Sequence, residues 1–514
     1  MIRSGRRAPA RRAGVLTVLT VLVVGSCTPG ASTSPPSAGS AAPPTATPLT
    51  ATPRPAPPFP AAAERDLPGD PDWSTVTLGG HQVEGFTDTD SAVPGQPVRL
   101  YVSTVARSYR VRAYRMGWYG GARARLVWES GPQAGRRQAG ARVTGRTHTP
   151  SAAWQPSLSL DTRDWPPGDY LLRLDTDRGT LRSFVPLTLR TATARGAVVL
   201  VNADTTWQAY NAWGGYSLYR GPDGDRATRA RAVSFDRPYD KGGGAADFIG
   251  AELPLLALAE RLGLRLAYAT DVDLHRDPSL LDGAAAVVSL GHDEYWSPAM
   301  RTAVTRARDR GANVAFLGAN AVYRKIRFGP TGLGAYRLEI NFKDASDPIG
   351  RTDPSQVTTQ WREPPSDDNG SKLTGTDYGC SPVRADMVVV DPGSWLLSGL
   401  GLTAGSRLRG VVGSEFDRVF LGAPTPRPIQ VLTHSPVVCD GRRDVAESAY
   451  YTTASGAGVF DSGTSDWVAH LDGRDPQVRR VVTAVTTRLL VAFAAGPAGR
   501  AHPARDTAGR YASG

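Results

Sequence analysis

One strand–turn–helix unit constrains the fold of this chain more than any other segment. Val287–Leu290 is a short apolar run rich in β-branched residues, which is typical of a buried strand. Gly291 interrupts the run, and Ser297-Pro298 then supplies a helix N-cap followed by proline at the first helical position. The apolar spacing beyond predicts a helix that ends at Gly311. The intervening turn therefore lies at the carboxyl end of a strand, where open α/β sheets bind ligands.

Strands and helices alternate on both sides of this unit. The predicted strands are Val198–Val201, Leu264–Tyr268 and Val314–Leu317, and the predicted helices are Ala245–Leu262 and one that starts at Asp475-Pro476. Such alternation predicts a mostly parallel sheet with helices on both faces. A long insertion, roughly residues 323–404, is rich in Gly, Pro, Asp and Thr and is expected to be irregular.

The chain before this region has a β pattern. Val98, Leu100 and Val102 alternate with polar residues after the Pro94-Gly95 turn, and further alternating runs follow up to Leu189. Short strands separated by turn residues predict a β-sandwich of immunoglobulin-like size.

The N-terminus predicts export. Basic residues precede an apolar run, Val15–Val24, that is too short to span a membrane as a mature helix. Val24-Gly25-Ser26-Cys27 resembles a bacterial lipobox, which implies lipid attachment at Cys27; an ordinary signal peptide is the alternative. We expect an exported protein that a lipid holds to the extracellular face of the cell membrane. Arg11-Arg12 resembles a twin-arginine signal, so the export route stays open.

Composition divides the chain further. Residues 28–67 are mainly Pro, Ser, Thr and Ala, which cannot bury a core and predict an extended tether. Beyond Ala495 the Gly, Ala and Arg content predicts a disordered tail. The expected organisation is a lipoprotein-type signal peptide (1–27), the tether (28–67), the β-sandwich (68–192), the α/β domain (193–495) and the tail (496–514).

Charge and cysteines limit the classes of partner and site. The formal charge is +11, but five arginines precede Cys27 and the others are scattered, without interleaved aromatic residues. This pattern argues against nucleic-acid binding. Cys380 and Cys439 lack the close spacing that zinc sites favour, so outside the cell they most simply form a disulfide.

Three predicted strand ends carry hydrogen-bonding side chains to one edge of the sheet. Tyr210 follows the first, His292 and Glu294 follow the second, and Asn320 follows the third. A carboxylate can ligate a metal or act as a base, and a nearby histidine can accept a proton or support a ligand. A buried salt bridge would give the same residues. The sequence motifs of serine nucleophile elbows and phosphate-binding loops are absent, and His292 stands where an amidotransferase-like fold would carry its cysteine.

Several segments together resemble the large (beta) subunit of N,N-dimethylformamidase and its relatives. These segments are Tyr114–Gly121, Trp207–Asn211, Ser234–Tyr239, Gly291–Trp296 and Gly318–Asn320. The resemblance covers about residues 73–495. It implies β plus α/β architecture, with an N-terminal immunoglobulin-like β-sandwich followed by a glutamine-amidotransferase-like α/β domain.

The resemblance also implies a mononuclear Fe(III) site held by two tyrosinates and a glutamate. Glu294 corresponds to the ligand glutamate and Tyr210 to one ligand tyrosine, while Tyr170 is the candidate for the other. His292 and Asn320 correspond to the catalytic histidine and asparagine. Glu415 corresponds to a further acidic residue of the catalytic site.

The implied reaction is hydrolysis of a non-peptide amide C–N bond in a small amide substrate. The iron would act as a Lewis acid, with His292 as base or proton shuttle and Asn320 orienting water or the oxyanion. Whether the chain forms a homo-oligomer or binds a small partner subunit stays open. One alternative is a non-catalytic envelope protein that binds glycan or peptide. Another is a carbohydrate-active enzyme that pairs Glu294 with Glu415, which their separation would test.

Overall fold

The computed structural model describes residues 61–74, 80–177, 181–422 and 424–511. The expected signal peptide, Cys27 and the expected tether up to residue 60 lie outside these residues. The end of the expected tether is folded: α1 (Ala61–Glu64) and η1 (Pro71–Ser74) open the described chain. Glu64 is buried and accepts hydrogen bonds from Arg125 (2.8 Å) and from the hydroxyl of Tyr119 (2.7 Å). A buried carboxylate with two such partners explains why an Ala- and Pro-rich segment becomes ordered here.

Two β-sheets share a hydrophobic core in the first half of the described chain. The smaller sheet has the order β1 (Val83–Thr87), β3 (Val98–Thr104) and β9 (Leu158–Leu160). The larger has the order β2 (Ser91–Ala92), β11 (Arg182–Leu189), β10 (Gly168–Thr176), β4 (Ser108–Met116) and β5 (Ala124–Glu129), with β6 (Gln133–Ala134) beside β4. Leu100, Val111, Leu172 and Leu187 belong to the shared core, as their alternation with polar neighbours predicts.

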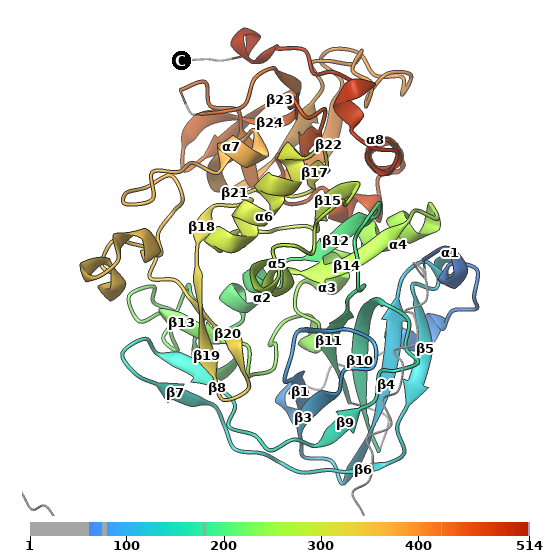
Figure 1. Cartoon of the computed structure of the whole chain (residues 1–514), viewed down its shortest axis with the longest axis vertical. Helices are drawn as coiled ribbons and strands as arrows, with labels where there is room; N and C mark the ends of the chain where they lie inside the picture. Colours follow the sequence, from blue (N-terminus) through green and yellow to red (C-terminus); the bar gives the residue numbers. More distant parts are fainter. Residues whose placement is uncertain (1–60, 75–79, 178–180, 423, 512–514) are drawn as a thin grey trace, which may run out of the picture. The chain divides into compact units, whose positions relative to one another are not determined.

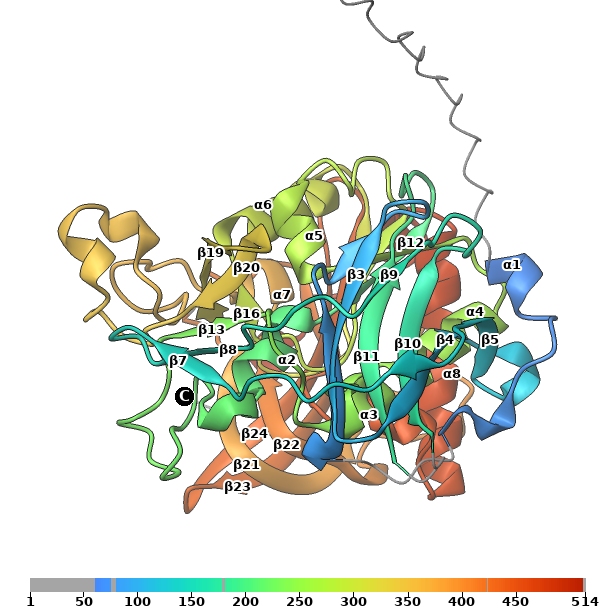
Figure 2. The same cartoon turned by 90° about the horizontal axis from the view of Figure 1, so that it is seen from below.

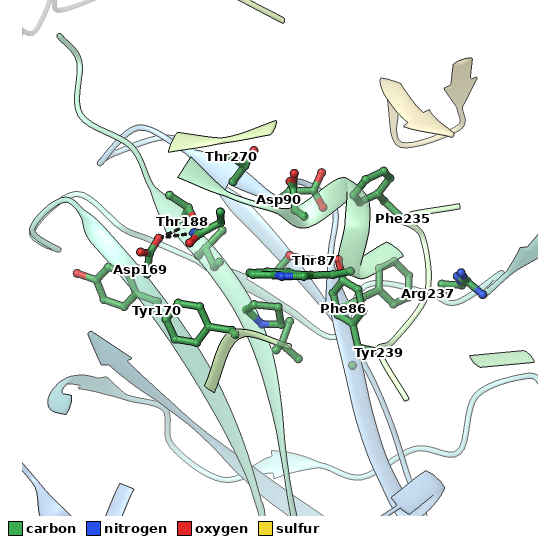
Figure 3. Close-up of a pocket in the computed structure, with 18 residues that line it drawn as sticks. Phe86, Thr87, Asp90, Asp169, Tyr170, Thr188, Phe235, Arg237, Tyr239 and Thr270 are labelled. Atoms are coloured by element: carbon green, nitrogen blue, oxygen red, sulfur yellow. Dashed lines mark hydrogen bonds between the residues drawn. The ribbon is translucent and has the colours of Figure 1, made fainter. Parts of the chain in front are cut away.

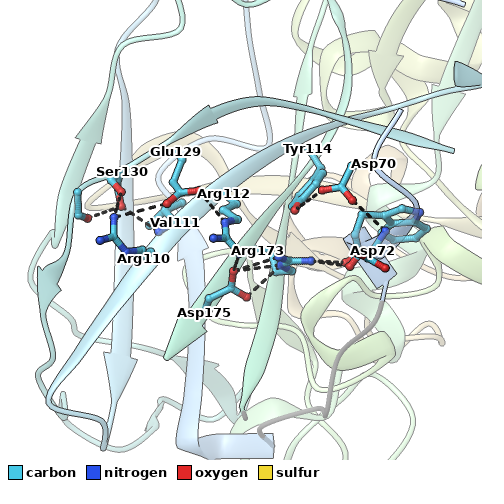
Figure 4. Close-up of polar contacts among 12 residues, drawn as sticks. Asp70, Asp72, Arg110, Val111, Arg112, Tyr114, Glu129, Ser130, Arg173 and Asp175 are labelled. Atoms are coloured by element: carbon cyan, nitrogen blue, oxygen red, sulfur yellow. Dashed lines mark hydrogen bonds and ion pairs between the residues drawn. The ribbon is translucent and has the colours of Figure 1, made fainter. Parts of the chain in front are cut away.

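The other face of the larger sheet carries a row of polar contacts (Figure 4). Arg112 on β4 contacts Glu129 on β5 (2.8 Å) and Asp175 on β10 (2.9 Å). Arg173 pairs with Asp175 and donates to the carbonyls of Asp72 and Trp73 (3.0 and 2.9 Å). These bonds hold η1 against the sheet.

A seven-stranded sheet forms the centre of the second half. Its order is β14 (Leu266–Thr270), β12 (Val198–Asn202), β15 (Ala286–Ser289), β17 (Asn313–Phe316), β25 (Gly458–Asp461), β24 (Arg442–Thr452) and β23 (Ile429–Cys439). The pairs from β14 to β25 are parallel and those from β25 to β23 are antiparallel. The predicted mostly parallel sheet is therefore confirmed.

Helices cover both faces of this sheet (Figure 1). The core on one face includes α4 (Leu253–Arg261) and α8 (Pro476–Ala494), and the core on the other includes α5 (Asp271–Arg276) and α6 (Pro298–Asp309). The first core also takes in Tyr114, Leu171 and Phe184 of the larger β-sheet. That sheet therefore lies between the smaller β-sheet and the α/β region (Figures 1 and 2).

The structure differs from the sequence prediction at one helix and at the insertion. The predicted helix 245–262 is broken into α3 (Phe248–Ala251) and α4 at Glu252, whose φ is −128°. The insertion is irregular over much of its length, as predicted, but it also contains strands. Its strands are β18 (Arg324–Lys325), β19 (Arg327–Thr331), β20 (Gly334–Ile340) and β21 (Asp377–Val388), and it also holds the short helices η6 (Pro348–Arg351), η7 (Pro354–Gln356) and α7 (Ser371–Thr374). β21 pairs with β22 (Arg407–Arg418) through several register shifts, and such bulges remove the period-2 pattern from the sequence.

The remaining short elements connect these layers. They are η2 (Gly80–Gln82), η3 (Tyr119–Gly121), β7 (Arg142–Thr144), β8 (Thr149–Ser151), α2 (Asp204–Tyr210), η4 (Trp213–Gly215), β13 (Ala232–Ser234), η5 (Gly242–Gly244), β16 (Tyr295–Trp296), η8 (Val468–Leu471), η9 (Ala498–Arg500) and η10 (Ala508–Arg510). A disulfide joins Cys380 in β21 to Cys439 at the end of β23, with an S–S distance of 2.01 Å. No helix among the described residues has the length and apolar character needed to cross a bilayer.

The expected disordered tail is folded as far as Tyr511. Asn313 donates to the carbonyl of Gly496 (2.7 Å), and the amide of Thr507 donates to the carbonyl of Ile429 (2.9 Å). Ala498 and Ala508 are buried. Small alanine side chains give a weak periodic signal, which explains why composition suggested disorder. Residues 512–514 lie outside the described part of the chain.

Candidate metal centre

Close approach of two strand-end turns positions His292 and Glu294. Gly291 has a φ of +62°, and a Cβ there would lie 2.7 Å from the carbonyl oxygen of Ala251. A Cβ on Gly318, after β17, would lie 2.1 Å from the carbonyl oxygen of Gly291. Both positions therefore require glycine. The turn then leads into β16 and α6, where Ser297 caps the helix as predicted.

Two phenol hydroxyls converge on one carboxylate oxygen. Tyr210, at the end of α2, donates to Oε2 of Glu294 (2.8 Å), and Tyr219 donates to the same atom (2.6 Å). The two rings stack with centroids 4.3 Å apart. Glu294 is 2% exposed, and its amide donates to the hydroxyl of Thr206 (2.9 Å). Three oxygen donors from separate segments thus occupy one small buried volume.

Two basic side chains flank this group, and burial lowers the pKa of one of them, Lys343, well below its ordinary value. Arg324 Nε lies 3.4 Å from Oε1 of Glu294. Lys343 donates to the hydroxyl of Tyr295 (2.7 Å), which in turn donates to Tyr219 (2.8 Å), and Nζ of Lys343 lies 3.2 Å from the Tyr219 ring centroid. Burial raises the pKa of Tyr210 and of Tyr219 well above its ordinary value, and the negative charge of Glu294 adds to this. The phenols are therefore neutral unless a further cation joins them.

His292 pairs with Glu415 beside the phenols. Its Nε2 lies 2.9 Å from Oε2 of Glu415 in β22 and 3.8 Å from Oε2 of Glu294. Burial lowers the pKa of His292, but the charge of Glu415, its hydrogen bond to His292 and the charge of Glu294 together outweigh burial and raise that pKa to about 9. Burial raises the pKa of Glu415, yet His292 and Asn320 together hold it below its ordinary value.

Several buried polar atoms here lack a hydrogen bond of good geometry. They are Nε2 of His292, Oε2 of Glu415 and Oδ1 of Asn320. Asn320 follows β17 with a φ of +61°, and its backbone amide is fixed by Asp417 (2.7 Å). The His292 and Glu415 atoms face each other as an ion pair, so Oδ1 of Asn320 is the one of the three that is left for a ligand, a metal or water.

A cleft of about 540 Å³ leads to this group. Its lining includes Tyr210, His292 and Glu415, with Ile249, Ala251 and Lys241. This size suits a small molecule. A second, smaller pocket, where β1 and the larger β-sheet meet the α/β region, offers only about 30 Å³ (Figure 3), room for little more than water. The cleft is therefore the place for a substrate.

The structure brings together Tyr210, His292, Glu294, Asn320 and Glu415. It does not bring Tyr170 to them. Tyr170 belongs to the core shared by the two β-sheets, its ring stacks on Trp165 (5.3 Å) and its hydroxyl donates to the carbonyl of Pro166 (2.6 Å). The side chain points inward because it alternates with Leu171 along β10.

Tyr219 occupies the place proposed for Tyr170, and sequence reasoning missed it together with Arg324 and Lys343. Tyr219 lies in an irregular loop, and Lys343 follows β20 with a φ of +65°. Neither has a periodic neighbourhood that would show which way it faces. The only available signal was the density of aromatic residues after Tyr210.

Two other arrangements of candidate residues are less suited to chemistry. Glu294 and Glu415 both lie within 4 Å of Nε2 of His292, and Glu294 already accepts hydrogen bonds from two phenols. This arrangement does not favour a glycosidase, in which two carboxyl groups flank a sugar. Cys380, Cys439 and Asp440 form the only group of three His, Cys, Asp or Glu side chains close enough for a metal among the described residues. Its sulfurs are joined in the disulfide and are not thiolate ligands.

Comparison with known proteins gives the family of the chain. No curated protein matches the chain. The family model described as N,N-dimethylformamidase beta subunit-like, C-terminal, matches residues 110–480, which include every residue of the candidate metal centre. The match spans well over half of the sequence. The chain therefore belongs to the N,N-dimethylformamidase beta subunit-like family.

Proposed function

We propose that this protein is an iron-dependent hydrolase of a non-peptide amide C–N bond that acts at the cell surface. The observation that carries the proposal is the convergence of the Tyr210 and Tyr219 hydroxyls on one oxygen of buried Glu294. Membership of the family supports an amidohydrolase-like activity, since dimethylformamidase is named for an amide substrate.

The residues present fit Fe(III). Tyr210, Tyr219 and Glu294 would hold it, because phenolate and carboxylate oxygens are hard donors. The neutral phenols and the Asn320 Oδ1 atom without a hydrogen bond are what a centre built for an additional cation would show. When bound, the ion supplies Lewis-acid polarisation of an amide carbonyl and lowers the pKa of water.

The protein's own side chains then bind substrate and move protons. The cleft admits the amide beside Tyr210. His292 Nε2 and Glu415 Oε2, 2.9 Å apart, pass a proton from the attacking water to the leaving amine. Asn320, held by Asp417, orients the water or the developing oxyanion. The stacked rings of Tyr210 and Tyr219 limit access of other water molecules.

We also propose an immunoglobulin-like sandwich, an amidotransferase-like domain and a location at the cell surface. The two β-sheets on one core support an immunoglobulin-like sandwich, and the parallel strands with helices on both faces support an amidotransferase-like domain. Export and lipid attachment at Cys27 rest on the N-terminal sequence alone. A small partner subunit, or a second copy of the chain, would complete the assembly.

The decisive experiment measures iron and its spectrum in the full chain after iron-supplemented expression. We expect stoichiometric iron, a visible tyrosinate-to-iron absorption band, and release of dimethylamine from N,N-dimethylformamide or of amines from larger amides. Tyr210→Phe and Tyr219→Phe should each weaken or remove the band. Tyr170→Phe is the matched control and should leave it unchanged. A folded protein with only trace iron would refute the proposal.

A further inference from the structure

Trp118 points to a second binding surface. It belongs to Tyr114–Gly121, a segment that carries the family resemblance but does not line the cleft. Its half-buried indole lines a groove of about 460 Å³ between the loop before η3, helix α4 and the start of α8. α4 and α8 lie on the same face of the central sheet (Figure 1). The metal centre does not account for this groove.

The fold gathers four arginines around Trp118. Arg123, Arg261, Arg479 and Arg480 line the groove, and Asp472 is its one acidic residue. Arg123 pairs with Asp472 at 2.5 Å. These arginines are far apart in the sequence, so no basic stripe is visible there. The groove is therefore strongly positive even though the sequence shows only scattered charge.

Three of these guanidinium groups have capacity for a ligand. Arg261 lies over the Trp118 ring at 5.0 Å, while Arg479 and Arg480 donate only to the carbonyls of Gly473 (3.2 Å) and Leu400 (3.3 and 3.2 Å). Among the described residues, none of the three forms an ion pair with a carboxylate. All three are exposed and each carries five N–H donors.

We propose that this groove binds an acidic oligosaccharide. The planar guanidinium matches a carboxylate in a bidentate geometry, which gives the required sign and specificity. Each uronic-acid unit presents a carboxylate and a flat apolar ring face together, and the groove presents arginines beside an indole. An acidic peptide carries its charges on flexible side chains and lacks that apolar face. This proposal does not depend on the metal centre or on amide hydrolysis.

The test measures binding of fluorescent oligogalacturonate to the full chain at low ionic strength. Methyl-esterified oligogalacturonate is the control ligand without charge, and poly-glutamate is the control ligand with negative charge but no sugar ring. We expect Arg479→Ala/Arg480→Ala to weaken binding about tenfold, as loss of two exposed ionic contacts would. Arg306→Ala/Arg310→Ala removes two arginines, one in α6 and one directly after it, on the other face of the sheet and should leave binding unchanged.

The role of the indole is tested separately. Trp118→Ala should weaken binding severalfold, while Trp118→Phe should retain most of it, and unchanged thermal unfolding shows that each variant is folded. Equal binding of the methyl ester would overturn the proposal. An equal loss of binding in the Arg306→Ala/Arg310→Ala control would also overturn it. So would the absence of oligogalacturonate binding at millimolar concentration, or tighter binding of poly-glutamate that Trp118→Ala does not change.

Discussion

Two buried clusters in this protein contain the same residue types but differ in how completely their polar atoms are hydrogen-bonded. Where the larger β-sheet meets α4 and β14, Arg115 and Glu260 are fully buried and pair at 2.7 Å. Tyr268 donates to Glu260 (2.7 Å), and Arg115 also donates to Tyr119 (2.8 Å) and to the carbonyl of Pro167 (3.0 Å). None of these side chains has an unpaired buried polar atom among the described residues.

The candidate metal centre is also built from tyrosine, glutamate and arginine. There, however, His292, Asn320 and Glu415 keep polar atoms without well-formed hydrogen bonds, and a cleft reaches the group. A saturated cluster can only hold elements together, because every donor and acceptor already has a partner. Unsatisfied buried atoms cost stability, so their presence beside a cleft indicates a ligand that repays that cost.

The largest expected effect is loss of stability on breaking the saturated cluster. Arg115→Met leaves the Glu260 charge buried without its partner and should lower the unfolding free energy by about 3–5 kcal/mol. Arg115→Met/Glu260→Gln should recover part of this loss, because the charge is removed. Denaturant unfolding measures both, and iron content per folded molecule should not change. A loss below about 1 kcal/mol in the single variant would contradict the assignment.

A second prediction concerns Asp169, which lies at the small cavity between the larger sheet and the α/β region (Figure 3). Burial raises the pKa of Asp169 to about 6, although Asn202 and Thr188 donate hydrogen bonds to it. Between about pH 4 and 6 the folded chain retains a proton that the unfolded chain has lost. Stability therefore falls as pH rises through this window, by roughly 3 kcal/mol from this group.

Asp169→Asn keeps the accepting oxygen and removes the titration. Its unfolding free energy should fall less than that of the wild type between pH 4 and 7, as measured by denaturant unfolding at several pH values. Asp161→Asn, at an exposed position, is the matched control and should follow the wild type. Identical pH profiles for Asp169→Asn and wild type would show that the folded chain holds the Asp169 carboxyl ionised over this pH range.

The third prediction addresses the unsaturated cluster. His292→Ala and Glu415→Gln should each lower amide hydrolysis about 100-fold, the effect of losing a positioned proton carrier. The unfolding free energy should change much less than in Arg115→Met, because the His292–Glu415 pair borders the cleft. Steady-state kinetics on the iron-loaded full chain measures the first quantity. Unchanged rates in both variants would remove the pair from the reaction.

The elements that sequence could predict are those with a regular apolar period. β12, β15 and β17 lie within a residue or so of the predicted strands, and α6 has the predicted cap and length. β21 could not be predicted because its register shifts at Tyr378 and again near Cys380, which destroys alternation. The break at Glu252 could not be predicted because the helical spacing of apolar residues continues across it. In the structure the Glu252 carboxylate accepts a hydrogen bond from the indole of Trp207.

The candidate site shows the same limit. Glu294, His292 and Asn320 follow regular strands, so their common edge could be inferred from the sheet. Tyr219 and Lys343 reach the site from irregular segments, and only tertiary packing decides where such side chains point. The family resemblance places Tyr170 at the site, but Tyr170 alternates with Leu171 on β10, and that pattern directs its ring into the core shared by the two β-sheets.

The smallest expected change in unfolding free energy is for two tyrosines, one in each cluster, that make the same kind of hydrogen bond. Tyr219 and Tyr268 donate to buried glutamates at 2.6 and 2.7 Å. Tyr268→Phe should cost about 1–2 kcal/mol of unfolding free energy, since Glu260 and Arg115 each lose a partner, and should leave iron content unchanged. Tyr219→Phe should cost no more stability in the iron-free protein, yet reduce iron content and the visible band. Denaturant unfolding and metal analysis of both variants would separate the clusters. If both changes affected stability alone, the metal centre would be a second structural cluster, because only a ligand-binding group makes the loss of one hydroxyl visible in bound iron.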